Sequence, residues 1–286
     1  MALLFCFSAP LDESGLEGLK IRYKVQEKKL LSEIKQFIKR SVSGGAHQSV
    51  RLKWVKQSGH SWLSQQIKAD FIAPEKTAFS ATIETLAAET NQSGPQPLWN
   101  GYAGNNIAGS TRMPDEVRTA ATMGNLYTFL VQALQPNIIV EFGTAFGVSG
   151  MYFLAGIESN HKGQLLTFEP NDVWRNLAVR NLSRISDRFQ STAGTFEENI
   201  DKVLPQGQSI DLAFIDAIHT KEFVIPQLEI VMARSSDKAI IILDDINFSA
   251  SMRECWETVS NDSRFLASAA LDERVGILEL NKSRKD

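Results

Sequence analysis

The chain has 286 residues, 43% of them hydrophobic and 22% charged, a composition typical of an ordinary globular protein. Its net charge of −3 and pI near 5.9 argue against attraction of the whole molecule to nucleic acid or to an anionic membrane. The two cysteines, Cys6 and Cys255, form no CxxC pair and no metal-ligand spacing, so we expect reduced thiols in a cytoplasmic protein. No run approaches the ~18 apolar residues of a membrane span.

Residues 1–115 are expected to form a mainly helical N-terminal extension that includes a lid or linker. Between residues 12 and 56, eleven Lys or Arg stand against five Asp or Glu, and apolar residues recur at roughly helical spacing from Leu16 to Ile38. This pattern predicts a basic amphipathic helix, which either packs on its own protein or docks on a partner. The Gly-, Asn- and Pro-rich stretch 91–112 predicts a long loop, in which Trp99 and Tyr102 either form part of a lid or pin the segment to the body.

Residues 116–286 alternate between helical and apolar strand-like segments. A helix opened by Pro114 is expected over 116–134, and strands are expected at 138–142, 164–168, 189–193, 210–215 and 239–243. The stretch 264–280 reads as two strands joined by a short turn, which must pair antiparallel. The pattern predicts an α/β fold: a doubly wound, mostly parallel seven-stranded sheet with a terminal antiparallel hairpin.

The stretch EFGTAFGVSG, residues 141–150, follows the first of these strands, at the edge where ligands bind in such sheets. Gly143 and Gly147 allow a tight turn and close approach to a ligand, but Ala145 breaks the G-x-G-x-x-G spacing of a dinucleotide site. Glu141, expected at the mouth of the site, would repel a pyrophosphate and suit an ammonium group. The turn therefore predicts S-adenosylmethionine, which carries an ammonium and a sulfonium but no phosphate.

The next two strands end in residues that suit the rest of this cofactor. Glu169 ends the second strand, where an acid typically accepts hydrogen bonds from ribose hydroxyls. Gly194, Thr195 and Phe196 follow the third strand and are expected to line an adenine pocket. Phe196 fits equally well as a core contact of the following helix.

Carboxylates end the last two parallel strands, Asp216 on the fourth and Asp244 and Asp245 on the fifth. Three acids at one sheet edge repel one another unless a cation lies between them, and oxygen ligands suit Mg²⁺, Mn²⁺ or Ca²⁺. The alternative is that one aspartate caps a helix and another meets solvent. His219 is expected to be a general base or substrate contact, with metal ligand and structural histidine as its alternatives; Lys221 is a weaker candidate for the base.

The segment 116–280 resembles the class I S-adenosylmethionine-dependent methyltransferases, and more narrowly the small-molecule O-methyltransferases of the catechol and caffeoyl-CoA type and their macrocin-type relatives. The resemblance rests on VEFGTAFGVS, LLTFEP, IDLAFIDAIHT and AIIILDDINF, and it covers a little over half of the chain. It implies a divalent ion on Asp216, Asp244 and Asp245 that binds two substrate oxygens. The chain departs from the catechol-type pattern at His219, where those enzymes usually have a lysine as the base. The cofactor-binding residues implied are Glu141, Gly143, Thr144, Gly147, Ser149, Glu169, Gly194, Thr195, Phe196 and Asp216.

The function expected from these features is metal-assisted O-methylation of a hydroxyl on a small molecule, in natural-product, phenol or sugar tailoring. In that mechanism a metal held by Asp216, Asp244 and Asp245 lowers the pKa of the hydroxyl, His219 takes the proton, and the oxygen attacks the sulfonium methyl, so that His219 and Asp216 are the expected catalytic residues. The alternatives are a metal-independent N- or O-methyltransferase and a non-catalytic cofactor-binding module that acts through the basic N-terminal helix. The acidic pI disfavours a nucleic acid substrate, and a homodimer is an expectation without a heptad to support it.

Overall fold

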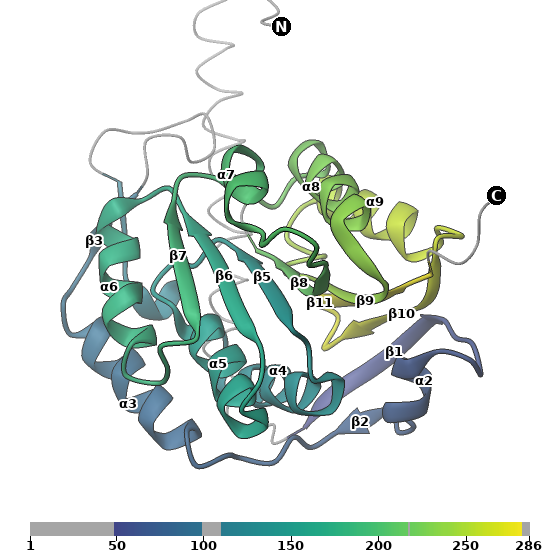
Figure 1. Cartoon of the computed structure of the whole chain (residues 1–286), viewed down its shortest axis with the longest axis horizontal. Coiled ribbons are helices and arrows are strands. Elements are labelled where there is room, and N and C mark those ends of the chain that lie inside the picture. The colour runs from purple at the N-terminus through teal and green to yellow at the C-terminus, as the bar shows by residue number, and fades with distance from the viewer. Residues whose placement is uncertain (1–48, 99–109, 217, 282–286) are drawn as a thin grey trace, which may run out of the picture. The chain divides into compact units, whose positions relative to one another are not determined.

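The computed structural model describes residues 49–98, 110–216 and 218–281, which belong to one compact unit, His47–Asp286. In these residues the main sheet has nine strands, in the order β2-β1-β10-β11-β9-β8-β5-β6-β7 (Figure 1). Its strands are β1 (Val50–Lys56), β2 (Phe71–Ile72), β5 (Ile138–Phe142), β6 (Gln164–Glu169), β7 (Phe189–Ala193), β8 (Ile210–Ile215), β9 (Ser235–Leu243), β10 (Phe265–Leu271) and β11 (Val275–Leu280).

The predicted α/β fold is confirmed for the part of the sheet formed by the second half of the chain. Strands β5 to β9 pair in parallel, and β10 and β11 form an antiparallel hairpin that joins the sheet through β9. Strand order reverses beside β5, because the chain runs outward to β6 and β7 on one side and then returns to β8 on the other. The carboxyl ends of β5 and β8 therefore meet at a switch point, where doubly wound sheets bind ligands.

Helices cover both faces of the sheet because successive strand residues point to opposite sides. Along β5, Ile139 packs in a cluster with α4 and α5, whereas Ile138 and Val140 pack with α7, α8 and α9. The helices are α2 (Trp62–Gln66), α3 (Ser80–Asn91), α4 (Ala121–Leu134), α5 (Val148–Asn160), α6 (Asp172–Leu182), α7 (Phe196–Val203), α8 (Lys221–Arg234) and α9 (Ala250–Ser260). A small separate ladder pairs β3 (Gln96–Pro97) with β4 (Thr111–Arg112).

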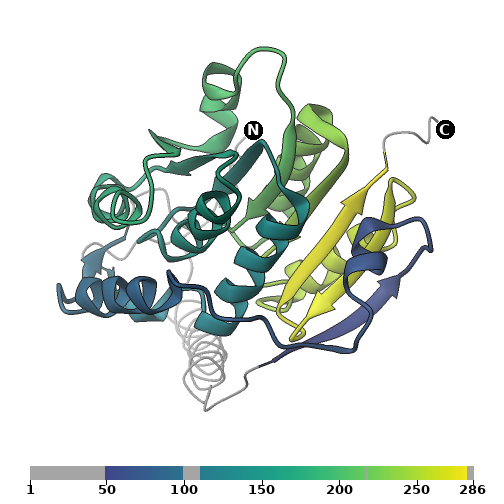
Figure 2. The ribbon, with the colours of Figure 1, turned by 60° about the horizontal axis from the view of Figure 1, so that its bottom comes forward.

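The segment before residue 116 contributes strands to the main sheet, which the sequence did not predict. Strand β1 pairs antiparallel with the hairpin strand β10, with Leu52 opposite Leu271, and β2 pairs with the outer side of β1. Figure 2 shows β1 and α2 beside the yellow hairpin. The compact unit thus begins well before the expected boundary at residue 115, and its described N-terminal part is of mixed rather than mainly helical structure.

Some expectations fall on residues outside the described ranges. These are the basic amphipathic helix before residue 49, the lid aromatics Trp99 and Tyr102, and Cys6. Cys255 is buried on α9 as a free thiol. Among the helices of the described ranges, none combines the length and apolarity needed to cross a bilayer.

Candidate cofactor and acceptor site

The turn between β5 and α5 contains three residues with left-handed backbone. Gly143, Ala145 and Gly147 have φ angles of 82°, 46° and 83°. This conformation costs a residue with a Cβ roughly 1–2 kcal/mol, so the two glycines meet the need of the turn and Ala145 bears the strain. Gly147 precedes the first residue of α5, and a Cβ on it would lie 3.2 Å from the Cα of Ala178 on α6. The tight turn predicted from the sequence is present here, and the close approach of its backbone to a ligand stays a prediction.

Glu141, at the end of β5, lies beneath this turn and not at its mouth. Its side chain is fully buried, and its two oxygens accept hydrogen bonds from Ser149 Oγ at 2.6 Å and Thr167 Oγ1 at 2.7 Å. Thr144 shares a hydrogen bond with Thr167 in turn. Burial raises the pKa of Glu141 to about 7. The placement at the mouth expected from the sequence is therefore corrected: Glu141 orders Ser149 and Thr167 below the site.

Glu169 ends β6 beside the same turn. Its Oε2 accepts a hydrogen bond from the amide of Ala145 at 2.8 Å, and its Oε1 accepts one from the amide of Asn171 at 2.9 Å. Burial raises the pKa of this carboxyl to about 7, against the lowering effect of the two amides. The bond to Ala145 holds the strained residue of the turn in place. The role of Glu169 toward a ribose stays a prediction.

The third expected cofactor segment lies at the end of β7. Gly194 has a φ of 97°, and Thr195 caps α7 in a reciprocal capping box with Glu198. Phe196 is buried and stacks on Phe142 with ring centroids 3.7 Å apart. The environment of Phe196 is thus the core contact that the sequence left as an alternative, and its predicted contact with adenine has no exposed ring face to support it.

The carboxylates predicted at the ends of β8 and β9 come together with His219. His219 Nε2 lies 3.6 Å from an oxygen of Asp216 and 3.6 Å from an oxygen of Asp245. A fifth group, which the sequence did not single out, completes the cluster: Arg274 donates to Asp245 through Nε at 2.7 Å and to Asp244 through Nη2 at 3.1 Å. We call these five residues the acidic cluster.

Charges within the acidic cluster shift one another's protonation. Burial and the nearby carboxylates of Asp244 and Asp245 raise the pKa of Asp216 well above its usual range, and the same two kinds of effect raise the pKa of Asp245. The carboxylate of Asp244, with that of Asp245, raises the pKa of Arg274, so its guanidinium stays charged. The guanidinium compensates part of the negative charge and lowers the pKa of Asp216 and of Asp245, but burial and the neighbouring carboxylates outweigh it.

The arrangement does not fit the divalent ion expected from the sequence. One oxygen of Asp244 and one of Asp245 already accept hydrogen bonds from Arg274, whose positive charge lies against the face that an ion would need. Among the residues that the structure describes, no group of three His, Cys, Asp or Glu side chains is arranged to hold a metal. We therefore route no step of the chemistry through a metal.

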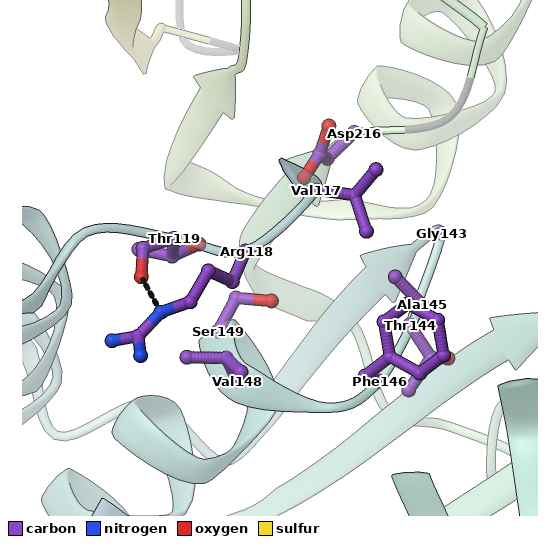
Figure 3. Close-up of a pocket in the computed structure, with 10 residues that line it drawn as sticks. All are labelled: Val117, Arg118, Thr119, Gly143, Thr144, Ala145, Phe146, Val148, Ser149 and Asp216. Carbon is purple, nitrogen blue, oxygen red and sulfur yellow. Dashed lines mark hydrogen bonds between the residues drawn. The ribbon is translucent and has the colours of Figure 1, made fainter. Parts of the chain in front are cut away.

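A shallow recess, which we call the hollow, lies between the β5–α5 turn and the segment that precedes α4. Figure 3 shows Arg118 and Thr119 on one side of it, the turn residues on another, and Asp216 at one end. Its lining residues are Val117, Arg118, Thr119, Gly143, Thr144, Ala145, Phe146, Val148, Ser149 and Asp216. The hollow thus joins the predicted cofactor turn to a carboxylate of the acidic cluster.

The residues of the hollow that precede α4 were missed in the sequence, since no motif marks them. Arg118 donates to both oxygens of Glu84 on α3, and Tyr152 on α5 donates to the same carboxylate at 2.8 Å. This network fixes the segment against two helices. Arg118 is the cation in the wall of the hollow, and its side chain is 17% exposed.

Comparisons with known proteins agree with this geometry. Residues 140–246 match a family model described as a methyltransferase domain. A catechol O-methyltransferase of Mycobacterium tuberculosis is 26% identical over 132 residues, which are 46% of this chain and 57% of that protein. The chain therefore spans little more than half the length of this curated relative.

Solved structures show the same fold. An O-methyltransferase from Bacillus cereus, in complex with SAH, superposes with a TM-score of 0.53 at 18% identity, over 77% of this chain and 96% of that one. TomG, an O-methyltransferase from Streptomyces achromogenes in complex with SAM, gives a TM-score of 0.53 at 14% identity, over 73% and 92%. The matched segment and the strand order together assign the fold to the Rossmann-like methyltransferases.

Proposed function

Because the chain contains a class I S-adenosylmethionine-dependent methyltransferase domain, we propose that it transfers the methyl group of S-adenosylmethionine to a hydroxyl of a small molecule. The observation that carries this proposal is the double position of Asp216. It lines the hollow beside the β5–α5 turn, and one of its oxygens lies 3.6 Å from His219 Nε2. A cofactor in the hollow would thus present its methyl group next to a base.

A negative charge in the wall of the hollow suits the methionine part of the cofactor: Asp216 lies where it could attract the ammonium or the sulfonium. The guanidinium of Arg118 is already paired with Glu84, so we assign it no contact with the cofactor. Ser149 also lines the hollow, at the start of α5, and is held by Glu141. Glu169, at the end of β6, would accept hydrogen bonds from the ribose.

The chemistry then needs one proton acceptor. A new O–CH₃ bond forms as the S–CH₃ bond breaks, the sulfonium becomes a thioether, and the hydroxyl proton passes to His219. The imidazolium that forms would lie between the carboxylates of Asp216 and Asp245, which stabilise its charge. A positioned base of this kind raises the reaction rate about 10²–10⁴-fold, and in-line alignment of the two reactants raises it further.

We choose a hydroxyl as the acceptor group because the similar proteins named above are O-methyltransferases. An assay on phenols, sugars and natural products would identify the acceptor. Phe248 presents an aromatic ring that is 40% exposed at 5.3 Å from the His219 ring, which suits an acceptor with an apolar part. N-methylation, a homodimer and a cytoplasmic location stay predictions from the sequence, whereas metal assistance is not proposed, because Arg274 already binds Asp244 and Asp245.

Calorimetry with S-adenosylmethionine and S-adenosylhomocysteine tests the first half of the proposal, and transfer of a labelled methyl group to a panel of phenols and polyols tests the second. We expect binding of both cofactor forms and turnover of at least one hydroxyl acceptor. Binding without turnover of any acceptor favours the non-catalytic module instead. A chain that binds neither form but takes up NAD contradicts the proposal.

A further inference from the structure

The acidic cluster contains its own cation. Arg274 bridges the adjacent carboxylates of Asp244 and Asp245 with two different nitrogens, at 3.1 and 2.7 Å. Guanidinium groups hold carboxylates with directional, charge-assisted hydrogen bonds of this length. Two of the three acids at this sheet edge, Asp244 and Asp245, therefore already have a counter-ion that the chain itself supplies.

The backbone around Arg274 is fixed next to these acids. The hairpin turn between β10 and β11 has two residues of left-handed backbone, Asp272 and Glu273, with φ of 49° and 57°. The carbonyl of Arg274 accepts a hydrogen bond from the amide of Ile246 at 2.8 Å, and Asn247 donates from its side chain to the carbonyl of Glu273. The turn is thus joined to the loop that follows Asp245, and the guanidinium does not depend on a flexible segment for its position.

A divalent ion and this guanidinium would bind the same two carboxylate groups, those of Asp244 and Asp245. Mg²⁺ and Ca²⁺ need carboxylate oxygens at about 2.0–2.6 Å. An ion at that distance from both Asp244 and Asp245 would lie close to the guanidinium that these two residues already bind, and like charges repel. Unlike a bound metal, the arginine is part of the chain and has no open coordination position for a substrate oxygen.

We propose that Arg274 takes the place of a divalent ion in this site, so that the acceptor centre is metal-independent and its acceptor is oriented by hydrogen bonds and not by a metal. The orientation of the acceptor by hydrogen bonds rests on the proposed methyl transfer. The replacement of an ion by Arg274 does not rest on it, because ion binding is measured without cofactor or substrate.

The test is a gain of metal binding when Arg274 is removed. Mn²⁺ is titrated into the full-length protein and followed by calorimetry and by the electron paramagnetic resonance signal of free Mn²⁺. We expect no saturable site in the wild type and one new site per chain in Arg274→Gln, with affinity at least about tenfold tighter than any wild-type binding. Arg274→Lys, which keeps the charge, is expected to remain without the site.

Arg264→Gln is the matched control. Arg264 also bridges two carboxylates, those of Glu229 and Asp262, but on the exposed surface, so its loss changes the net charge equally without opening a buried cluster. We expect this variant to bind no more Mn²⁺ than the wild type.

Thermal unfolding covers the case in which Arg274→Gln folds poorly. Removing the guanidinium leaves buried carboxylates uncompensated, so the variant should melt lower than the wild type, and Mn²⁺ should restore much of the loss only in the variant. A well-folded Arg274→Gln that gains no Mn²⁺ site overturns the proposal. So does a wild type that binds Mn²⁺ with Arg274 present and loses it in Asp245→Asn. Failure of cofactor binding in the same proteins would affect the proposed function alone.

Discussion

His219 lies between two carboxylates, and this position decides which base the site can use. The competing base, Lys221, points away to α9, where its Nζ bonds Glu254 Oε1 at 2.6 Å. The imidazole lies against Asp216, which lines the hollow, whereas the lysine is paired with an exposed glutamate. The geometry therefore favours His219 over Lys221 as the proton acceptor.

We expect His219→Asn to lower kcat about 10²–10⁴-fold while the dissociation constant for S-adenosylmethionine changes little, because His219 is not among the residues that line the hollow. Steady-state kinetics on the acceptor found in the panel and calorimetry with the cofactor measure the two effects. Lys221→Met is the matched control and should keep wild-type turnover. Equal losses in the two variants would contradict the assignment of the base.

Glu141 gives a pH dependence of stability with a defined sign. Folding raises its pKa from 4.5 to about 7, so between these values the folded chain holds a proton that the unfolded chain releases. The free energy of unfolding of the wild type therefore falls as pH rises through this window, and the contribution of Glu141 is about 3 kcal/mol. The amide of Glu141→Gln does not ionise. We expect the variant to gain stability relative to the wild type by up to that amount between pH 5 and pH 8 in urea denaturation.

Glu257→Gln is the control for this pH series. Glu257 is an exposed carboxylate on α9, solvated in both the folded and the unfolded chain, so the variant should run parallel to the wild type. If the free energy of unfolding of Glu141→Gln also changes with pH in the same way as that of the wild type, burial does not raise the pKa of Glu141 as described.

Sequence reasoning located most single residues of the site but not their surroundings. The order of strand ends was sufficient to bring Asp216, Asp244 and Asp245 to one edge, because parallel strands share their carboxyl ends. It did not identify Arg274, since a lone arginine in a hairpin turn has no motif and its pairing spans about thirty positions. The burial of Glu141 also escaped, because it depends on two hydroxyls supplied by α5 and β6.

Helices α4 and α5 approach closely because glycines remove side chains from their contact. A Cβ on Gly156 of α5 would lie 2.6 Å from the Cβ of Val131 and 3.0 Å from the carbonyl oxygen of Thr128, both on α4. Neither atom is the end of a flexible side chain, so the helices themselves would have to move apart. The N-terminus of α5, which carries Ser149 into the hollow, would move with them.

We expect Gly156→Ala to destabilise the fold by about 1–3 kcal/mol, because overpacking outweighs the gain of about 1 kcal/mol that alanine brings to a helix interior. Chemical denaturation measures the change. Gly59→Ala is the matched control, since a Cβ there meets nothing within 4 Å. A stabilised Gly156→Ala would mean that the two helices are packed less closely than described.

Elements were predictable where a single pattern governs them. The five parallel strands and the hairpin follow from short apolar runs separated by helical segments, and the structure confirms them. Strand β1 was missed although Val50 and Leu52 are buried while Arg51 and Lys53 are exposed, a strict alternation typical of a strand. The charges on its exposed face made the segment look like a continuation of the basic region before it, so the two-residue alternation of a strand was overlooked.

As a whole, the unit His47–Asp286 depends on this early segment. Strand β1 covers the edge of the hairpin strand β10, and Val50 and Leu63 are fully buried in the core below. Glu279 on β11 is also fully buried, and its carboxylate accepts hydrogen bonds from Ser61 Oγ and from the amides of Trp62 and Leu63. The main sheet and the start of α2 are therefore joined through a buried carboxylate.

This dependence predicts different behaviour for two shortened chains. A chain that begins at residue 116, where the sequence suggested a domain boundary, leaves the edge of β10 unpaired and Glu279 without its three donors. We expect it to aggregate or to lose cooperative unfolding, and with it affinity for S-adenosylmethionine. A chain that begins at His47 keeps these contacts and should unfold in one cooperative transition and bind the cofactor. Circular dichroism melts and calorimetry on both chains measure this, and equal melting temperatures would restore residue 116 as the start of an independent domain.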